Sequence, residues 1–225
     1  MPARRAIFAE FVGTFALMFV GGGAIIVTGG ENLLAIALAH GLILGVMVSA
    51  TMHISGGQIN PAVSIALWVI RKQSSLQTGL FMGAQLAGAI AAAAVLRGVY
   101  DVDSVKLGAT LGTLNDDGNV LGVIVLETIG TFFLMFVIMG TAVDDRGVGK
   151  TKAVGGFGIG LTVAAVILCI GPATGASLNP ARSFGPALIG NVWDDQGLYW
   201  LAPIIGAVLA ALAYRAAFGT AARQD

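Results

Sequence analysis

Residues 55–62 read SGGQINPA and residues 174–181 read TGASLNPA, so the chain carries an Asn-Pro-Ala box twice. A short apolar run follows each box, at residues 61–70 and 180–190. A helix needs about 20 apolar residues to cross a membrane, so neither run is a span. Proline suits the first position of a helix, and asparagine is a favoured N-cap. Both runs are therefore predicted to be short helices that begin at the boxes.

The composition around the boxes indicates a membrane protein. Of the 225 residues, 56% are hydrophobic and 11% are charged, and the mean hydropathy is +0.88. An ordinary soluble domain carries about 25% charged residues. Apolar runs long enough to span a bilayer lie at about residues 6–27, 33–52, 79–97, 120–142, 153–171 and 197–218. The sequence therefore predicts six transmembrane helices.

Parts of the first half recur in the second half. The segment EFVGTF at residues 10–15 returns as ETIGTF at residues 127–132, and the two boxes stand 119 residues apart. Each half contains three spans, an odd number, so the second copy must cross the membrane in the opposite sense. The sequence thus predicts one transmembrane domain over residues 1–225, with inverted repeats at about 6–97 and 120–218.

The expected fold is an all-α membrane protein with six transmembrane helices and two re-entrant half-helices. The half-helices enter from opposite faces, so their N-termini meet near the midplane. Residues 56–59 and 175–178, directly before the half-helices, read as extended backbone. At membrane depth such backbone survives only where it is buried in protein or lines a wet cavity.

The basic residues predict the orientation. One side of the membrane collects Arg4, Arg5, Arg71, Lys72, Arg146, Lys150, Lys152, Arg215 and Arg223. The other side has Arg97 and Lys106, with the acidic residues Glu31, Asp101, Asp103, Asp116, Asp117, Asp194 and Asp195. Lys and Arg are retained in cytoplasmic loops. We therefore expect an integral multi-pass protein of the plasma (inner) membrane with both termini in the cytoplasm.

Charge and chemistry exclude several classes of protein. The 12 Lys and Arg balance the 12 Asp and Glu, so no nucleic-acid partner is expected. The single cysteine, Cys169, excludes an intrachain disulfide and a Cys-based metal cluster, and we interpret it as a buried apolar side chain. No nucleophile–base set and no metal-ligand spacing is present in the sequence. We predict no catalytic residue, no metal site, no cofactor and no enzymatic activity.

Two carboxylates, Glu10 and Glu127, lie inside predicted spans at repeat-related positions. An ionisable group in a span is costly and usually faces the protein interior. One interpretation is a proton relay. The other is that each carboxylate supports the re-entrant loop of its own half by accepting hydrogen bonds from backbone N–H groups.

These motifs together resemble the aquaporin (major intrinsic protein) family, and the resemblance covers nearly the whole chain. It rests on the two boxes in inverted halves and on Arg182 directly after the second box. Matching stretches are residues 10–14, 39–42, 53–57, 60–63, 179–186 and 199–200. The resemblance implies an aquaporin-like fold and a passive water channel without a cofactor. It also implies a homotetramer in the lipid bilayer in which every protomer carries its own pore for water and small neutral solutes.

The boxes are expected to line that pore at the midplane, through Asn60, Pro61, Ala62, Asn179, Pro180 and Ala181. The two asparagine amides can donate to a water oxygen, and the half-helix N-termini present positive dipole ends. A water held in this way interrupts a proton wire, and cations meet an electrostatic barrier. Backbone acceptors along one wall are expected from Gly56, Gly57, Gln58, Ile59, Gly175, Ser177 and Leu178.

The resemblance places the narrowest point of the pore at His40, Ile167, Ala176 and Arg182. Arg182 would oppose cations, or it would serve only in a structural salt bridge. His40 would face the pore, or it would be a core histidine bonded to a carbonyl. Protonation of His40 in acid would add a second positive charge beside Arg182, so acid-sensitive conductance is a hypothesis.

This filter departs from the strict water-channel pattern. Such channels typically carry Phe where this chain has His40, and His where it has Ile167. The combination resembles the plant tonoplast class, whose members pass water and variously ammonia, urea, glycerol or hydrogen peroxide. Dedicated glycerol channels carry Asp where this chain has Ser183, and residues 199–200 resemble the water class. Water is the expected substrate, with small neutral solutes in addition.

Two other functions stay open at this point. A proton-coupled secondary transporter also uses inverted repeats and broken helices, and would need Glu10 or Glu127 in the substrate path. A structural membrane protein would conduct nothing. The connection at about residues 101–119 is a further open point, because it could fold over the outer mouth and add a contact to the filter.

Overall fold

The computed structural model describes residues 4–100, 103–147 and 155–219, and these residues form helices and no strand. Its elements are α1 (Arg4–Val27), α2 (Leu33–Ser55), α3 (Pro61–Val69), α4 (Ser75–Val99), η1 (Asp103–Gly108), α5 (Thr113–Asp116), α6 (Val120–Ile138), η2 (Met139–Val143), α7 (Gly155–Thr174), α8 (Pro180–Gly190) and α9 (Leu198–Phe218). Six helices are long and apolar enough to cross a membrane: α1, α2, α4, α6 with η2, α7 and α9. The prediction of six spans is confirmed.

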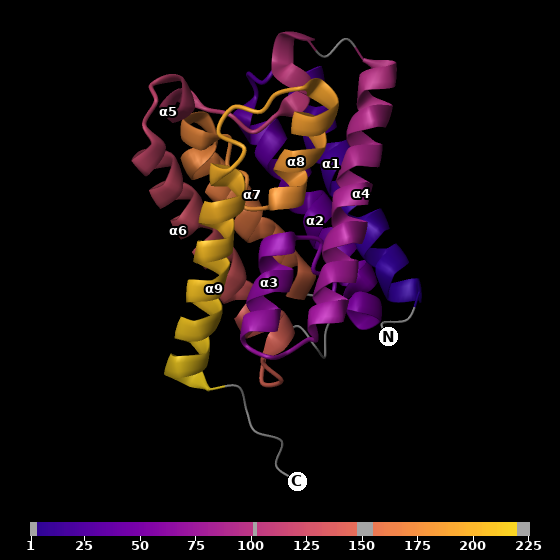
Figure 1. Ribbon diagram of the computed structural model, residues 1–225, viewed down its shortest axis with the longest axis vertical. Coiled ribbons are helices and arrows are strands. Elements are labelled where there is room, and N and C mark those ends of the chain that lie inside the picture. Colours follow the sequence, from indigo (N-terminus) through magenta and orange to yellow (C-terminus); the bar gives the residue numbers. More distant parts are fainter. Residues whose placement is uncertain (1–3, 101–102, 148–154, 220–225) are drawn as a thin grey trace.

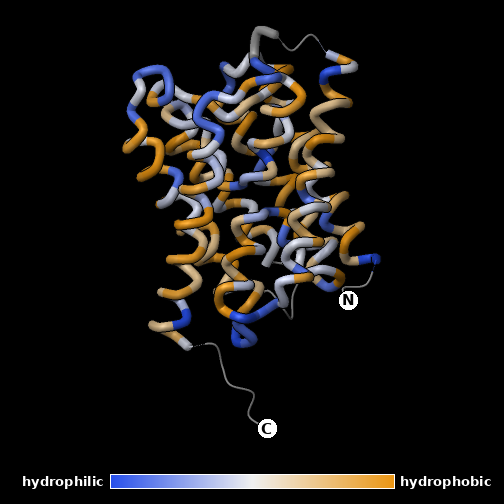
Figure 2. The backbone as a smooth tube through the Cα atoms, in the orientation of Figure 1, coloured by the Kyte–Doolittle hydropathy of each residue, from blue (hydrophilic) through white to orange (hydrophobic). Residues whose placement is uncertain are grey.

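The long helices surround the two short helices α3 and α8 (Figure 1). Helix α8 lies in the upper half of the view and α3 in the lower half, so they approach each other from opposite ends. The start of α1 and the end of α9 lie at the lower end, which we call the inner side; η1 and α5 lie at the outer side. Hydrophilic residues gather at these two ends, and hydrophobic residues cover the long helices between them (Figure 2). The fold is the predicted all-α membrane fold.

Both half-helices begin as the sequence predicts. The side-chain oxygen of Asn60 accepts a hydrogen bond of 2.9 Å from the backbone N–H of Ala62. The side-chain oxygen of Asn179 accepts one of 3.0 Å from the N–H of Ala181. Proline occupies the first helical position in each case, where its missing N–H costs nothing.

The two repeats meet where α2 crosses α7. A Cβ atom added to Gly41 would lie 2.6 Å from the carbonyl oxygen of Gly160, and one added to Gly160 would lie 2.1 Å from the carbonyl oxygen of Gly41. These two glycines are repeat-related. Close approach of the two backbones therefore requires glycine at both positions.

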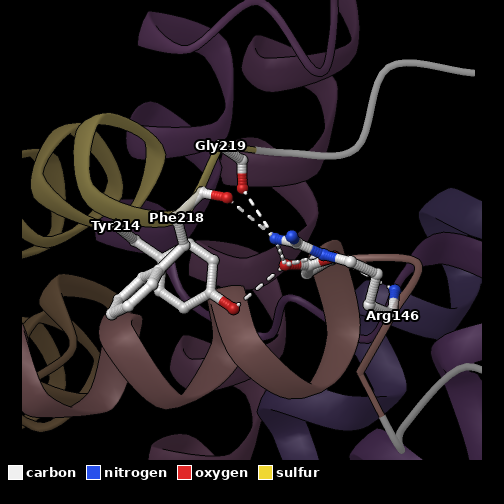
Figure 3. A network of polar contacts seen from close by, with 5 residues as sticks. Arg146, Tyr214, Phe218 and Gly219 are labelled. Atoms are coloured by element: carbon white, nitrogen blue, oxygen red, sulfur yellow. Dashed lines mark hydrogen bonds and ion pairs between the residues drawn. The ribbon is translucent and has the colours of Figure 1, made fainter.

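A polar cluster joins the segment that follows η2 to the inner end of α9 (Figure 3). The guanidinium of Arg146 pairs with Asp144 at 2.6 Å and donates to the carbonyl oxygens of Phe218 and Gly219 at 3.0 and 3.1 Å. Tyr214 donates its hydroxyl hydrogen to Asp144 at 3.1 Å. Hydrogen bonds from Arg146 hold the pKa of Asp144 well below its usual range. The cluster caps the last carbonyls of α9.

One prediction about side-chain placement is wrong. Cys169 is exposed on α7, where we expected a buried side chain. The charged residues Asp101, Lys150, Lys152 and Arg223, used above to predict the orientation, lie outside the described residues.

Candidate functional site

A narrow cavity of about 30 Å³ lies between the half-helices. On the outer side lies a vestibule of about 530 Å³, and His40, Ile167 and Arg182 line both this vestibule and the narrow cavity. On the inner side lies a vestibule of about 180 Å³, and Gly57 and Gln58 are among the residues that line both. A water molecule needs about 10–15 Å³ of such volume. The narrow part therefore holds only a few waters, in line between two wider mouths.

The structure brings most of the predicted site residues to this path. The narrow cavity is lined by His40, Gly57, Gln58, Asn60, Ile167, Ala176, Ser177, Leu178, Asn179 and Arg182. Gly56 lines the inner vestibule and Gly175 lines the outer one. The predicted pore-lining residues that line none of these three cavities are buried: Ile59, Pro61, Ala62, Pro180 and Ala181.

The two boxes are bonded to each other across the midplane. The amide nitrogen of Asn60 donates to the carbonyl oxygen of Leu178 at 2.7 Å, and that of Asn179 donates to the carbonyl oxygen of Ile59 at 2.8 Å. Ile59 and Leu178 both adopt the left-handed backbone conformation with φ of 54°, which bulky residues rarely adopt. An amide group carries two hydrogens. One hydrogen of each asparagine therefore locks the halves together, and the other is left for a water.

The carboxylate of Glu10, 0% exposed, binds the inner re-entrant loop. One oxygen accepts from Ser55 Oγ at 2.6 Å and from the N–H of Gln58 at 2.9 Å. The other accepts from the N–H of Ile59 at 2.6 Å and from Gln85 Nε2 at 2.8 Å. Sequence reasoning missed Gln85, although an amide in the middle of an apolar span is a signal for such a partner.

Glu127 binds the outer re-entrant loop in the same way. One oxygen accepts from Thr174 Oγ1 at 2.7 Å and from the N–H of Ser177 at 2.9 Å, and the other accepts from the N–H of Leu178 at 3.0 Å. Neither Glu127 nor Glu10 lines the three cavities described above. This placement favours the loop-supporting interpretation over a proton relay.

His40 and Arg182 lie side by side at the outer end of the narrow cavity. The carbonyl oxygen of Ile36 lies 2.9 Å from His40 Nδ1, and Arg182 Nη2 lies 3.3 Å from His40 Nε2. A carbonyl only accepts and a guanidinium only donates. Nδ1 therefore carries the hydrogen and Nε2 accepts, so these contacts require a neutral imidazole. His40 is thus both bonded to a carbonyl and part of the wall of the narrow cavity.

Arg182 is 3% exposed and forms no ion pair with a described carboxylate; among these residues the ion pair is Arg146–Asp144. Its Nη1 donates instead to the carbonyl oxygen of Gly108 and to Thr110 Oγ1, and its Nε has no partner. Part of the 101–119 connection therefore reaches Arg182. The guanidinium therefore lies at the outer end of the narrow cavity without an ion-pair partner among the described residues.

Comparisons with known proteins agree with this geometry. The sequence profile of the family described as Major intrinsic protein matches residues 1–214. The chain is 41% identical to Aquaporin TIP4-4 from Zea mays, with 95% of this chain and 86% of that protein covered. It is 39% identical to Nodulin-26 from Glycine max, with 95% and 78% covered. The X-ray structure of the aquaglyceroporin from Plasmodium falciparum superimposes with a TM-score of 0.81 at 27% identity, covering 93% of this chain and 94% of that one.

Proposed function

Because this chain belongs to the major intrinsic protein (aquaporin) family, we propose that it is a passive water channel that also admits small neutral solutes and excludes protons and ions. Members of this family are channels and not enzymes. The observation that carries the proposal is the narrow cavity between the two cross-bonded asparagines, with Arg182 at its outer end. Such a cavity has room for water in single file.

Ion exclusion rests on fixed charges and dipoles along this path. Two half-helix N-termini, at Asn60 and Asn179, point their positive dipole ends at the narrow cavity. Arg182 adds a positive charge that forms no ion pair with a carboxylate of the described residues. A cation would lose its hydration shell and meet positive potential, whereas a neutral molecule meets neither cost.

The filter side chains support the additional passage of ammonia, glycerol, urea or hydrogen peroxide. Ile167 and Ala176 are apolar and line the cavity together with His40 and Arg182. An aliphatic wall against a few polar groups suits a small solute with both kinds of surface.

The test exchanges two filter side chains. We expect His40→Phe/Ile167→His to keep osmotic water flow and to lose the flow of urea and glycerol, because the phenyl ring at position 40 is larger than the imidazole that it replaces and narrows the constriction. Stopped-flow light scattering on proteoliposomes measures water and solute flow separately. Leu168→Phe, a change at a 44% exposed neighbour of Ile167, is the matched control and should behave as wild type. Wild-type protein that raises no permeability above empty liposomes would contradict the channel and favour a structural role.

Water permeability is expected to stay constant between pH 5 and pH 8, contrary to the acid-sensitive hypothesis. Protonating His40 would remove the acceptor of Arg182 and put two cations 3.3 Å apart in a buried site. Neutral His40 is therefore retained in mild acid. Stopped-flow measurements in liposomes buffered equally on both sides test this. A fall in acid that His40→Asn abolishes would speak against it.

The protein is an integral multi-pass membrane protein, and its finer placement is part of the proposal. Both termini are assigned to the cytoplasm of a plasma (inner) membrane, supported by the basic residues on the inner side, such as Arg71, Lys72 and Arg215. We assign a homotetramer with one pore per protomer, partnered by lipid and by water and small solutes. The buried carboxylates, which line none of the three cavities, argue against a proton-coupled transporter.

A further inference from the structure

The connection between η1 and α5 holds the side chain of Arg182, a residue of α8, by hydrogen bonds. Thr110, 5% exposed, accepts a hydrogen bond from Arg182 Nη1 through its hydroxyl oxygen, and the carbonyl oxygen of Gly108 accepts a second one at 3.2 Å. On the other side of the guanidinium, His40 accepts at 3.3 Å. The orientation of Arg182 across the cavity thus depends on a residue 72 positions earlier in the chain.

The hydroxyl of Thr110 continues into a chain of buried hydroxyls. Thr110 Oγ1 lies 2.7 Å from Ser183 Oγ, and Ser183 Oγ lies 2.5 Å from Ser177 Oγ. Ser177 donates to the carbonyl oxygen of Asn179 at 3.1 Å and accepts from its N–H at 3.3 Å. Thr110, Ser183 and Ser177 are all at most 5% exposed. The chain therefore connects the filter to the second box without reaching water.

The carbonyl of Asn179 determines the direction of every bond in this chain. A carbonyl only accepts, so Ser177 gives its one hydrogen to Asn179 and must accept from Ser183. Ser183 has then used its own hydrogen and must accept from Thr110, which in turn accepts from Arg182. Hydrogen bonds aligned head to tail strengthen one another. Loss of a hydrogen bond at one end of this chain therefore weakens the hydrogen bonds at its other end.

The connection that carries Thr110 is seated closely on the outer re-entrant loop. A Cβ atom added to Gly175 would lie 2.7 Å from the backbone nitrogen of Leu111, and one added to Gly112 would lie 2.3 Å from the backbone carbon of Ala173. These distances leave no room for side chains. The position of Thr110 is thus set by backbone contact, and its hydroxyl is not free to leave Arg182.

The inner half has a serine in the place of Ser183 but no charged residue in the place of Arg182. Ser64, repeat-related to Ser183, donates to Gln58 Oε1 at 2.6 Å, and Gln58 is repeat-related to Ser177. The residue before Ser64 is Val63, in the place of Arg182, and it also lines the narrow cavity. A polarised chain that ends on a pore cation is therefore a property of the outer half.

We propose that Thr110 is a specificity-determining positioning residue, which fixes Arg182 across the constriction and, through Ser183 and Ser177, couples the filter to the Asn179 box. The inference rests on the proposed channel function. When the hydroxyl is lost, the guanidinium keeps Gly108 and His40 as acceptors but swings aside more often. The constriction then widens for solutes larger than water.

The experiment compares Thr110→Val, Thr110→Ser and Ser183→Ala with wild type in proteoliposomes, and its readout is the ratio of urea to water permeability. Valine has the shape of threonine without the hydroxyl, and one hydrogen bond to a charged group shifts such an equilibrium by about tenfold. We expect Thr110→Val to raise the ratio by about tenfold, Thr110→Ser to restore the wild-type ratio, and Ser183→Ala to raise it by a smaller factor. Thr162→Val, at a partly buried threonine that bonds only within α7, is the matched control and should leave the ratio unchanged.

These outcomes distinguish a failure of the role proposed for Thr110 from a failure of the proposed channel function. Wild-type liposomes without water flow would overturn the channel itself. Wild-type flow with an unchanged ratio in Thr110→Val would overturn the role of Thr110 and leave the channel standing. A ratio in Ser183→Ala equal to wild type would overturn the coupling to the box. Equal thermal unfolding of Thr110→Val and wild type in detergent is the check that a changed ratio reflects the filter and not a damaged fold.

Discussion

Replacement of Arg182 by valine is expected to make the pore leak cations while water flow continues. The change copies the inner half, where Val63 occupies the repeat-related position in the cavity wall. Two unit charges 4 Å apart repel by about 4 kcal/mol at an effective dielectric constant of about 20. Because about 1.4 kcal/mol corresponds to a tenfold change in rate, cation flux should rise by up to about a thousandfold. Potassium and proton flux into liposomes, followed with ion-sensitive dyes, measures it.

Arg182→Lys is the matched variant for this prediction. It keeps the positive charge and loses the planar fork that donates to Gly108, Thr110 and His40. We expect it to exclude cations as wild type does and to pass more urea. If Arg182→Val conducts water normally and still excludes potassium, the half-helix dipoles alone form the barrier and the role assigned to the guanidinium is wrong.

Replacement of Glu127 by glutamine is expected to lower the free energy of unfolding by about 3 kcal/mol, although the two side chains have the same shape. Both carboxylate oxygens accept from backbone N–H groups, of Ser177 and Leu178. A glutamine must turn its NH₂ group toward one of these donors, so a buried N–H loses its acceptor. The remaining bonds also lose the assistance of the charge. The outer re-entrant loop should loosen as a result.

Thermal unfolding in detergent measures this effect. A loss of about 3 kcal/mol corresponds to a fall of about 6–12 °C in the midpoint for a chain of this size. Thr128→Val, on the neighbouring residue of α6, removes a single bond of 3.3 Å to Ala202 and is the control. If Glu127→Gln unfolds at the same midpoint temperature as this control, the outer re-entrant loop does not depend on the carboxylate.

The sequence alone determined the parts of the protein that depend on local pattern. Length and hydropathy predicted the six spans, and the short runs after Asn60 and Asn179 predicted the half-helices. Asparagine and proline predicted where these helices begin, because capping needs only neighbouring residues. The family resemblance indicated His40, Ile167, Ala176 and Arg182, and the structure brings them to one cavity.

Only the tertiary structure decided which distant groups meet. The bond from Asn60 to Leu178, the acceptor Thr110 beside Arg182 and the amide of Gln85 on Glu10 join residues 72 to 118 positions apart, and local sequence pattern carries no information about such pairs. The sequence also did not show which side of a span is exposed, and Cys169, predicted to be buried, is exposed. In lipid both faces of a helix are apolar, because the bilayer is as apolar as the protein core. Hydrophobic periodicity, which tells core from surface in water, therefore does not tell the buried face from the lipid face here.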